Sequence, residues 1–259
     1  MKPTENFNDL IKLVQRLRKE CPWDRVQTHE SIKDNLIEET YEAIETIDEN
    51  NKAGLKEELG DLLLQVVFHS RMAAETDDFT IKEVIYALQK KLIVRHPHVF
   101  DNVKVKDQKD VEENWEKIKL KQGRTSVLEG IPKHMPALIQ AQRLQEKAGK
   151  VGFDWKHSAE GKKQVWHKLM EELSEFKEAY KSGDKEEIDA EFGDLLFSIV
   201  NAGRFLGVKA EDCLRGTNRK FKKRFNYIEE QFREKDRSLS EVSLEEMEDL
   251  WQEAKRKES

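Results

Sequence analysis

The stretch "GLKEELGDLLLQVV", residues 54–67, sets acids inside an apolar helical run, and "EIDAEFGDLLFSIV", residues 187–200, repeats the pattern 133 positions later. Aligning 38–62 with 171–195 keeps six acids in register: Glu38 with Glu171, Glu39 with Glu172, Glu42 with Glu175, Glu45 with Glu178, Glu58 with Glu191, and Asp61 with Asp194. An internal repeat predicts two similar halves. Apolar positions drifted meanwhile, as from Leu59 to Phe192. Retention of the acids favours a function for them over the alternative, solvated glutamates kept as good helix formers.

Gly60 and Gly193 stand between the two acids of their Glu-x-Gly-Asp steps. Glycine inside a helix costs about 1 kcal/mol relative to alanine. We therefore expect each glycine to let a neighbouring backbone or a ligand approach closely.

The composition favours long solvated helices. With 38% charged residues, five prolines and few strand-like runs, an all-α chain is expected. We predict two tandem helical-bundle domains related by internal duplication, 1–122 and 136–259, joined by a Gly- and Pro-containing linker over 123–135. Periodicity predicts helices at these ranges: 5–20, 28–49, 53–75, 80–95, 110–121, 136–149, 159–182, 184–206, 209–235 and 243–257. If Leu63 and Leu196 are buried in them, replacing either with alanine should cost about 2–5 kcal/mol.

Charge and cysteine usage limit the classes of protein. A net charge of −6 leaves no overall attraction to nucleic acid, so no stable nucleic-acid partner is expected. Cys21 and Cys213 form no Cys-x-x-Cys pair, which fits a reducing compartment. No apolar stretch approaches the roughly 20 residues of a membrane span, and "MKPTENFNDL" lacks the apolar core of a signal peptide. We expect a cytoplasmic protein with no membrane partner.

The acids of each half are spaced to converge. Glu39 and Glu42 share a helix face, as do Glu58 and Asp61, because residues three apart lie together. A turn at 50–51 lies midway between the two pairs, so an antiparallel hairpin sets them at the same height. The equivalent residues of the second half are Glu172, Glu175, Glu191 and Asp194, with Gly183 at the turn.

Four converging carboxylates repel one another unless a cation neutralises them. Oxygen ligands suit a hard divalent ion, so Mg²⁺ is expected, with Mn²⁺ as a substitute. The di-iron bundle proteins use Glu-x-x-His motifs, and the sequence has none. Zinc is disfavoured for the same reason, since no histidine joins the acids.

Cations for a polyphosphate are found in "NRKFKKRF", residues 218–225, where Lys220, Lys223 and Arg224 fall on one helix face. The alternatives are a solvated basic helix end and a short nucleic-acid patch. Lys91 and Arg95 repeat the spacing of Lys220 and Arg224 in the first half. Trp251 and its counterpart Trp115 are candidates for stacking on a base, although a tryptophan at helical spacing is also a usual core residue.

Taken together, "EETYE…ELGD" and "EELSE…EFGD", with "CPWD", "RHPHVF", "GIPKHMPAL", "KAGKVGFDW", "KFKKRF" and "EEMEDLWQEAK", resemble the all-α nucleoside triphosphate pyrophosphohydrolases of the two-domain MazG type. The resemblance covers essentially the whole chain. It implies a homodimer of helical bundles and Mg²⁺-dependent cleavage between the α- and β-phosphates, which releases a nucleoside monophosphate and pyrophosphate.

Carried onto matching positions, the resemblance implies that Glu172, Glu175, Glu191 and Asp194 are metal ligands. The implied substrate-binding residues are Lys168, Lys220, Lys223, Arg224 and Trp251. Glu171 is the candidate for activating water, while Lys220 and Arg224 would stabilise the leaving pyrophosphate. The second possible site comprises Glu38, Glu39, Glu42, Glu58, Asp61, Lys91, Arg95 and Trp115.

We expect catalysis in the second half, because Ile93 and Val94 stand where it has Lys222 and Lys223. The first half would then be degenerate, substrate-binding or dimer-stabilising. The expected function is house-cleaning hydrolysis of (d)NTPs with broad base tolerance. Two enzymatic rivals are a phosphoribosyl-ATP pyrophosphohydrolase and a dUTP-specific hydrolase. The rival outside enzymes is a non-catalytic acidic module that binds a regulatory partner.

Overall fold

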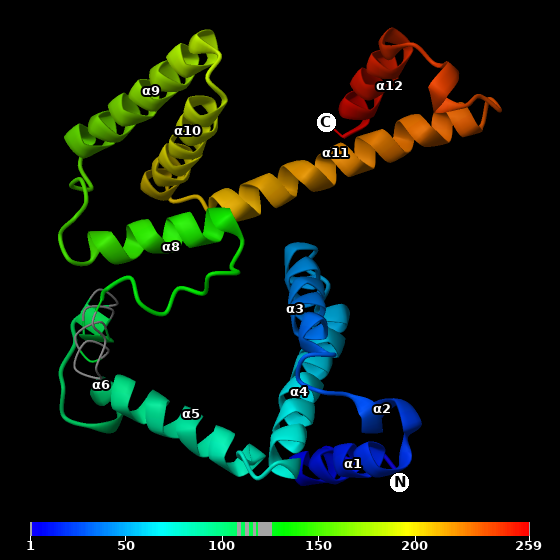
Figure 1. Ribbon diagram of the computed structural model, residues 1–259, viewed down its shortest axis with the longest axis vertical. Helices are drawn as coiled ribbons and strands as arrows, with labels where there is room; N and C mark the ends of the chain where they lie inside the picture. Colours follow the sequence, from blue (N-terminus) through cyan, green and yellow to red (C-terminus); the bar gives the residue numbers. More distant parts are fainter. Residues whose placement is uncertain (1, 108–109, 112–113, 116–117, 119–125, 259) are drawn as a thin grey trace. The chain divides into compact units, whose positions relative to one another are not determined.

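A computed structural model of the protein describes residues 2–107, 110–111, 114–115, 118 and 126–258. Its secondary structure is helical, with no strand in these ranges (Figure 1). The chain divides into two compact units, Met1–Trp115 and Glu116–Ser259, each described by itself below. The predicted all-α class is confirmed. The linker predicted at 123–135 and the helix predicted at 110–121 lie partly outside the described residues.

Unit 1 is built around a long helical hairpin. Its elements are α1 Phe7–Glu20, α2 Pro22–Val26, α3 Lys33–Asp48, α4 Lys52–Glu75, α5 Ile81–Arg95 and α6 Pro97–Phe100. The hairpin of α3 and α4 turns at Asn50, whose φ of 54° is left-handed. Asn51 then caps α4, because its Oδ1 accepts a hydrogen bond from the Gly54 N–H at 3.0 Å.

Unit 2 repeats the hairpin with different turn chemistry. Its elements are α8 Ala137–Gly149, α9 Ala159–Ser182, α10 Lys185–Leu206, α11 Ala210–Arg233, the 3-10 turn η1 Leu239–Glu241 and α12 Leu244–Lys257. Gly183 ends α9 with a φ of 76°, where glycine carries no Cβ penalty. Asp184 caps α10 through bonds from the backbone N–H groups of Glu186 and Glu187.

Each unit has its own core. In unit 1, Val14, Ile32, Val67, Phe68 and Met72 form one buried cluster. In unit 2, Val165, Ala202 and Phe205 form another, against which Trp155 and Leu169 pack. Two separate cores agree with the predicted duplication of a helical domain.

A second apolar face of each hairpin stays exposed, so the burial on which the alanine prediction depended is not met. Leu63 on α4 and Leu196 on α10 are each 40% exposed rather than buried. The side chains one turn before and after them are also exposed: Leu59 and Val66 on α4, and Phe192 and Ile199 on α10. Spacing of four and three residues places each set in one stripe. Within the described residues, therefore, these positions lie outside the core of one chain.

The glycines of the Glu-x-Gly-Asp steps lie beside these stripes. A Cβ added to Gly60 or Gly193 would meet no atom of the described residues within 4 Å. The close approach that we expected does not occur within the part of the chain that the structure describes. Both glycines face open space.

Candidate metal and nucleotide site

The hairpin of unit 2 gathers three of the four predicted metal ligands. Glu172 and Glu175 project from α9 and Glu191 from α10, and one carboxylate oxygen of each lies within 4.8 Å of the others. Glu172 is buried, Glu191 half-buried and Glu175 exposed. Asp194 lies outside this trio, one turn after Glu191, and it lines the cavity next to Glu172.

The negative charges of the trio repel one another. Burial raises the pKa of Glu191, and the negative charges of Glu175, Asp194 and Glu172 raise it further. A divalent cation among these oxygens would remove the repulsion. The donors are all carboxylates, which fits Mg²⁺ or Mn²⁺.

Lys168 forms ion pairs with two neighbouring acids of α9, Glu171 and Glu172. From one turn earlier on α9 its Nζ reaches Glu171 at 2.7 Å and Glu172 at 2.8 Å. The hydrogen bonds to these two carboxylates raise the pKa of Lys168, so it stays charged. Glu171, the predicted water-activating residue, is thereby held beside the buried Glu172.

A cavity of about 720 Å³ opens next to the cluster. It is lined by the charged residues Lys168, Glu172 and Asp194 and by apolar side chains that include Phe153, Trp155 and Phe197. Such a volume, with apolar walls and a few polar groups, is typical of small-molecule sites. The sequence analysis did not assign Phe153 or Phe197 to the site.

Asn201 is one of the polar residues that line this cavity. Its Oδ1 accepts hydrogen bonds from Arg204 Nε at 3.2 Å and Nη2 at 2.7 Å. Arg204 is held in turn by Asp154 through two bonds of 2.7 and 2.8 Å. With Oδ1 engaged in this way, the amide N–H groups of Asn201 are the donors left for other partners.

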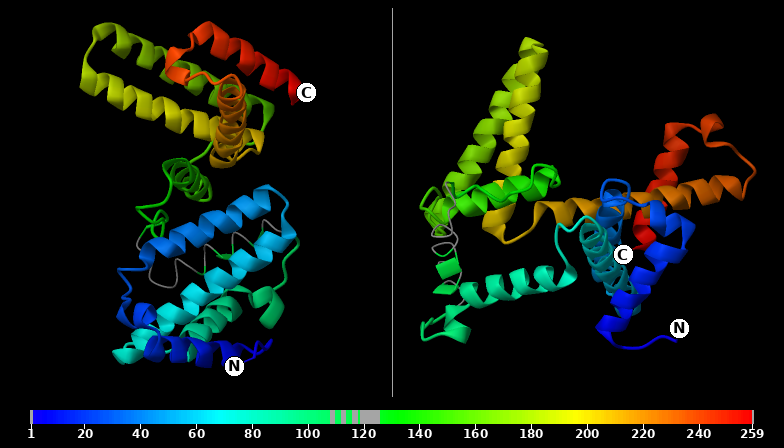
Figure 2. Two further views of the ribbon diagram at one scale, coloured as in Figure 1. Left: turned by 90° about the vertical axis from the view of Figure 1, so that its right-hand side faces the viewer. Right: turned by 60° about the horizontal axis from the view of Figure 1, so that its bottom comes forward.

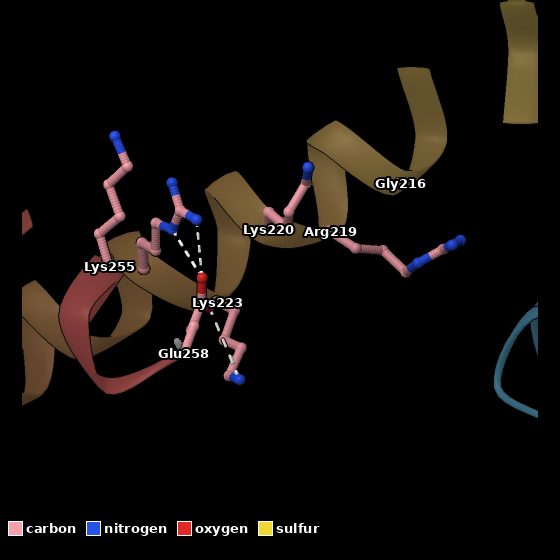
Figure 3. Close-up of a pocket in the computed structure, with 7 residues that line it drawn as sticks. Gly216, Arg219, Lys220, Lys223, Lys255 and Glu258 are labelled. Carbon is pink, nitrogen blue, oxygen red and sulfur yellow. Dashed lines mark hydrogen bonds and ion pairs between the residues drawn. The ribbon is translucent and has the colours of Figure 1, made fainter. Parts of the chain in front are cut away.

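The predicted cations occupy a different hollow, of about 550 Å³, on α11 and α12 (Figure 3). Its lining residues are Gly216, Arg219, Lys220, Lys223, Arg224, Lys255 and Glu258. Glu258 accepts hydrogen bonds from Arg224 Nε at 2.9 Å and Nη2 at 2.7 Å, and this pairing lowers its pKa. The Arg224 guanidinium lies 5.4 Å from the centre of the Trp251 ring. None of the clustered carboxylates lines this hollow.

The hairpin of unit 1 gathers a similar acidic trio. Oxygens of Glu39, Glu58 and Asp61 lie within 4.8 Å of one another. Burial raises the pKa of both glutamates, with further increases from Asp61 and Glu42. Glu42 and Glu38 are exposed on α3 outside the trio.

The remaining first-half candidates lie away from these acids in the chain. Lys91 and Arg95 belong to the last turns of α5. The ring of Trp115 meets His96 edge-on, with centroids 5.1 Å apart. Trp115 is half-buried against that histidine, which is the packing alternative that the sequence left open.

Comparisons with known proteins agree with the duplicated architecture. The MazG nucleotide pyrophosphohydrolase domain matches the chain twice, at residues 27–100 and 160–228. The chain belongs to this family of hydrolases, which confirms the predicted resemblance.

Similar proteins extend over nearly the whole chain. The nucleoside triphosphate pyrophosphohydrolase/pyrophosphatase MazG of Thermotoga maritima is 48% identical over 96% of this chain and 95% of its own. The nucleoside triphosphate pyrophosphohydrolase of Escherichia coli is 38% identical over 96% and 97%. A solved structure of a mazG-related protein from Thermotoga maritima aligns with a TM-score of 0.40 at 25% identity, covering 44% of this chain and 98% of that one.

No described helix is long and apolar enough to cross a membrane.

Proposed function

We propose that the protein is a Mg²⁺-dependent nucleoside triphosphate pyrophosphohydrolase whose working site is in unit 2. The observation that carries the proposal is the carboxylate trio of Glu172, Glu175 and Glu191, which adjoins a cavity large enough for a nucleoside. The names of similar proteins support the substrate class. The products would be a (d)NMP and pyrophosphate.

The residues around the trio have separable roles. Glu172, Glu175, Glu191 and Asp194 would hold the metal, which when bound neutralises phosphate charge. Glu171, fixed by Lys168 at 2.7 Å, orients a water molecule and accepts its proton. The water oxygen bonds to phosphorus while the α–β anhydride bond breaks, and the electron pair leaves on the bridging oxygen of pyrophosphate.

Broad base tolerance and a house-cleaning role belong to the same proposal. The cavity presents aromatic walls from Phe153, Trp155 and Phe197. Stacking on aromatic rings is available to every base, because each has a π face. A dUTP-specific or phosphoribosyl-ATP hydrolase would instead turn over a single substrate in a panel of nucleotides.

We further propose a homodimer in the cytoplasm. The exposed apolar stripes through Leu63 and Leu196 recur at equivalent positions of both hairpins, and exposed apolar patches of this kind commonly mark protein interfaces. Both cysteines are free, in keeping with a reducing compartment.

The test is product analysis of a mixed (d)NTP pool with Mg²⁺, using wild type, Glu191→Gln and Glu58→Gln. We expect monophosphate and pyrophosphate from wild type, with loss only in Glu191→Gln. Equal loss in both variants would indicate two coupled sites. Mg²⁺ binding without any turnover would favour the non-catalytic partner-binding module instead.

A further inference from the structure

A buried side-chain oxygen of unit 2 has no hydrogen-bond partner. Gln145 on α8 is only 7% exposed, and its Oε1 atom accepts no hydrogen bond from any described residue. Such an acceptor costs free energy, because its hydrogen bonds to water are lost on folding and nothing in the protein replaces them. Gln145 also lines the cavity of about 720 Å³ beside the carboxylates, so a ligand in that cavity is the partner that the oxygen lacks.

The orientation of the Gln145 amide is fixed by α10. Figures 1 and 2 show α8 crossing the α9–α10 hairpin at the end where α9 begins and α10 finishes. There Gln145 Nε2 donates a hydrogen bond of 2.9 Å to the backbone carbonyl oxygen of Phe197. A carbonyl oxygen can only accept, so the amide nitrogen must face it and Oε1 must face away. The unpaired group is therefore an acceptor, and its partner must be a donor.

Asn201 supplies the opposite group in the same cavity. Its Oδ1 is held by Arg204, so its amide N–H groups remain for another partner. Phe197, whose carbonyl holds Gln145, precedes Asn201 by four residues, or about 6 Å along the helix. An acceptor and a donor thus stand about one helical turn apart. Adenine, guanine, cytosine and uracil each carry a complementary pair on the Watson–Crick edge, an N–H next to a ring nitrogen or a carbonyl oxygen.

The cavity residues of α10 set this pair at a nucleotide's length from the acids. Asp194, Phe197, Ser198 and Asn201 all line the cavity, and their spacings of three and four residues place them on one face of the helix. Asp194 and Asn201 are about 10 Å apart along the axis. A nucleotide has a comparable length from its α-phosphate to the edge of its base, so a phosphate near Asp194 would bring the base edge to Asn201.

We propose that Gln145 and Asn201 recognise the edge of the nucleobase: Gln145 Oε1 accepts a hydrogen bond from a base N–H, and Asn201 donates one to the neighbouring acceptor. This inference rests on the proposed function and adds hydrogen bonds to the stacking on aromatic walls. Adenine would use its 6-amino group and N1, and uracil its N3–H and O4. The pair accepts all four bases and discriminates against a base without the N–H, because the buried oxygen then stays unpaired.

Steady-state hydrolysis of ATP and of purine riboside triphosphate by the full-length protein tests this recognition. The analogue has a hydrogen atom in place of the 6-amino group of ATP, so it can stack but cannot donate to Gln145. In wild type the KM of the analogue should be about tenfold above that of ATP, with kcat changed less than about twofold. Gln145→Met keeps the length of the side chain and removes its oxygen, so the KM ratio should fall below about twofold.

A matched control makes the same chemical change three residues earlier on α8. Gln142 donates a hydrogen bond to Glu146 and is not among the described residues that line the cavity, so Gln142→Met should keep the wild-type ratio. Because the ratio compares two substrates in one protein, partial loss of folded protein does not change it. If Gln145→Met does not fold, judged by circular dichroism, Gln145→Leu takes its place.

Two results would overturn the recognition of the base edge by Gln145. One is equal KM values for ATP and the analogue in wild type, and the other is a tenfold ratio that persists in Gln145→Met. The second result would assign the unpaired oxygen to a buried water molecule. Either result would leave the proposed hydrolase intact as long as ATP is turned over, whereas absence of turnover in wild type would reject the proposed function itself.

Discussion

Units 1 and 2 carry the same acids at equivalent positions, but they surround them differently. Asn35 stands in unit 1 where Lys168 pairs with Glu171 and Glu172 in unit 2. Phe68 stands where unit 2 has Asn201, and it is buried in the core of unit 1, whereas Asn201 lines a cavity. The two units therefore share the acids but not their surroundings. The difference lies in the space and the cation beside them.

The largest expected difference between the units is catalytic. Glu191→Gln should lower kcat/KM by at least about a hundredfold, because it removes one of the proposed metal ligands. The matched Glu58→Gln change should lower it less than about twofold. Pyrophosphate release measures both, and circular dichroism should show both proteins folded. Similar losses would mean that the two units work as equals.

The exposed stripes give the next comparison. A charge in an apolar interface is costly, so Leu196→Asp should convert the proposed dimer to a monomer and abolish most activity. Leu63→Asp tests whether the unit 1 stripe serves the same purpose. Size-exclusion chromatography with light scattering measures the oligomeric state of each variant. A Leu196→Asp protein that stays dimeric would show that the stripe of unit 2 is not the interface.

Replacing Asn201 of the unit 2 cavity with phenylalanine, the residue at the equivalent position 68 of unit 1, should change catalysis less than the two substitutions above. Asn201→Phe places the unit 1 side chain in unit 2, and by filling the cavity it should raise KM about tenfold with less change in kcat. The reciprocal Phe68→Asn should act on stability, by about 3–5 kcal/mol, because it removes a buried ring. Steady-state kinetics and urea unfolding check the pair. An unchanged KM for Asn201→Phe would place the nucleoside elsewhere.

The smallest expected effect concerns acid sensitivity. A hydrogen bond from Arg237, and then one from the Ser243 N–H, lowers the pKa of Glu246 to about 2. The stability from this pair is present above the ordinary glutamate value of 4.5 and is lost as pH falls through about 2. Glu246→Gln should therefore lower Tm slightly at pH 7 and not at pH 2. A difference in Tm that persists at pH 2 would assign the effect to the capping bond.

Some features of the structure follow from local sequence. Eight of the predicted helices, such as 159–182 and 243–257, match observed bounds to within two residues, because their caps and periodicity are local signals. The short α2 and α6 were missed, since four or five residues give too little periodicity. The turn midpoints predicted that four acids meet in each hairpin, and the structure gathers three of the four in each, with Glu42 and Asp194 outside the trios.

Other features depend on contacts that no local pattern encodes. Periodicity shows that Leu63 and Leu196 are apolar helix positions, but not that α4 and α10 turn them away from their own core. The orientation of Asn201 is set by Arg204 and Asp154, which are 50 residues apart. The separation of Lys220 from the acids depends on the direction that α11 takes after Gly207, and helix spacing does not determine that direction.

The carboxylate of Glu258 has a consequence for any anion that binds Arg224. It belongs to the same chain as Arg224 and is attached to the end of α12, so it returns to the arginine as a tethered competitor at high effective concentration. Any anion at this position is therefore held more weakly than at an unopposed arginine. If the hollow binds the pyrophosphate of the proposed reaction, this product would be exchanged for an internal carboxylate, and product inhibition would be limited.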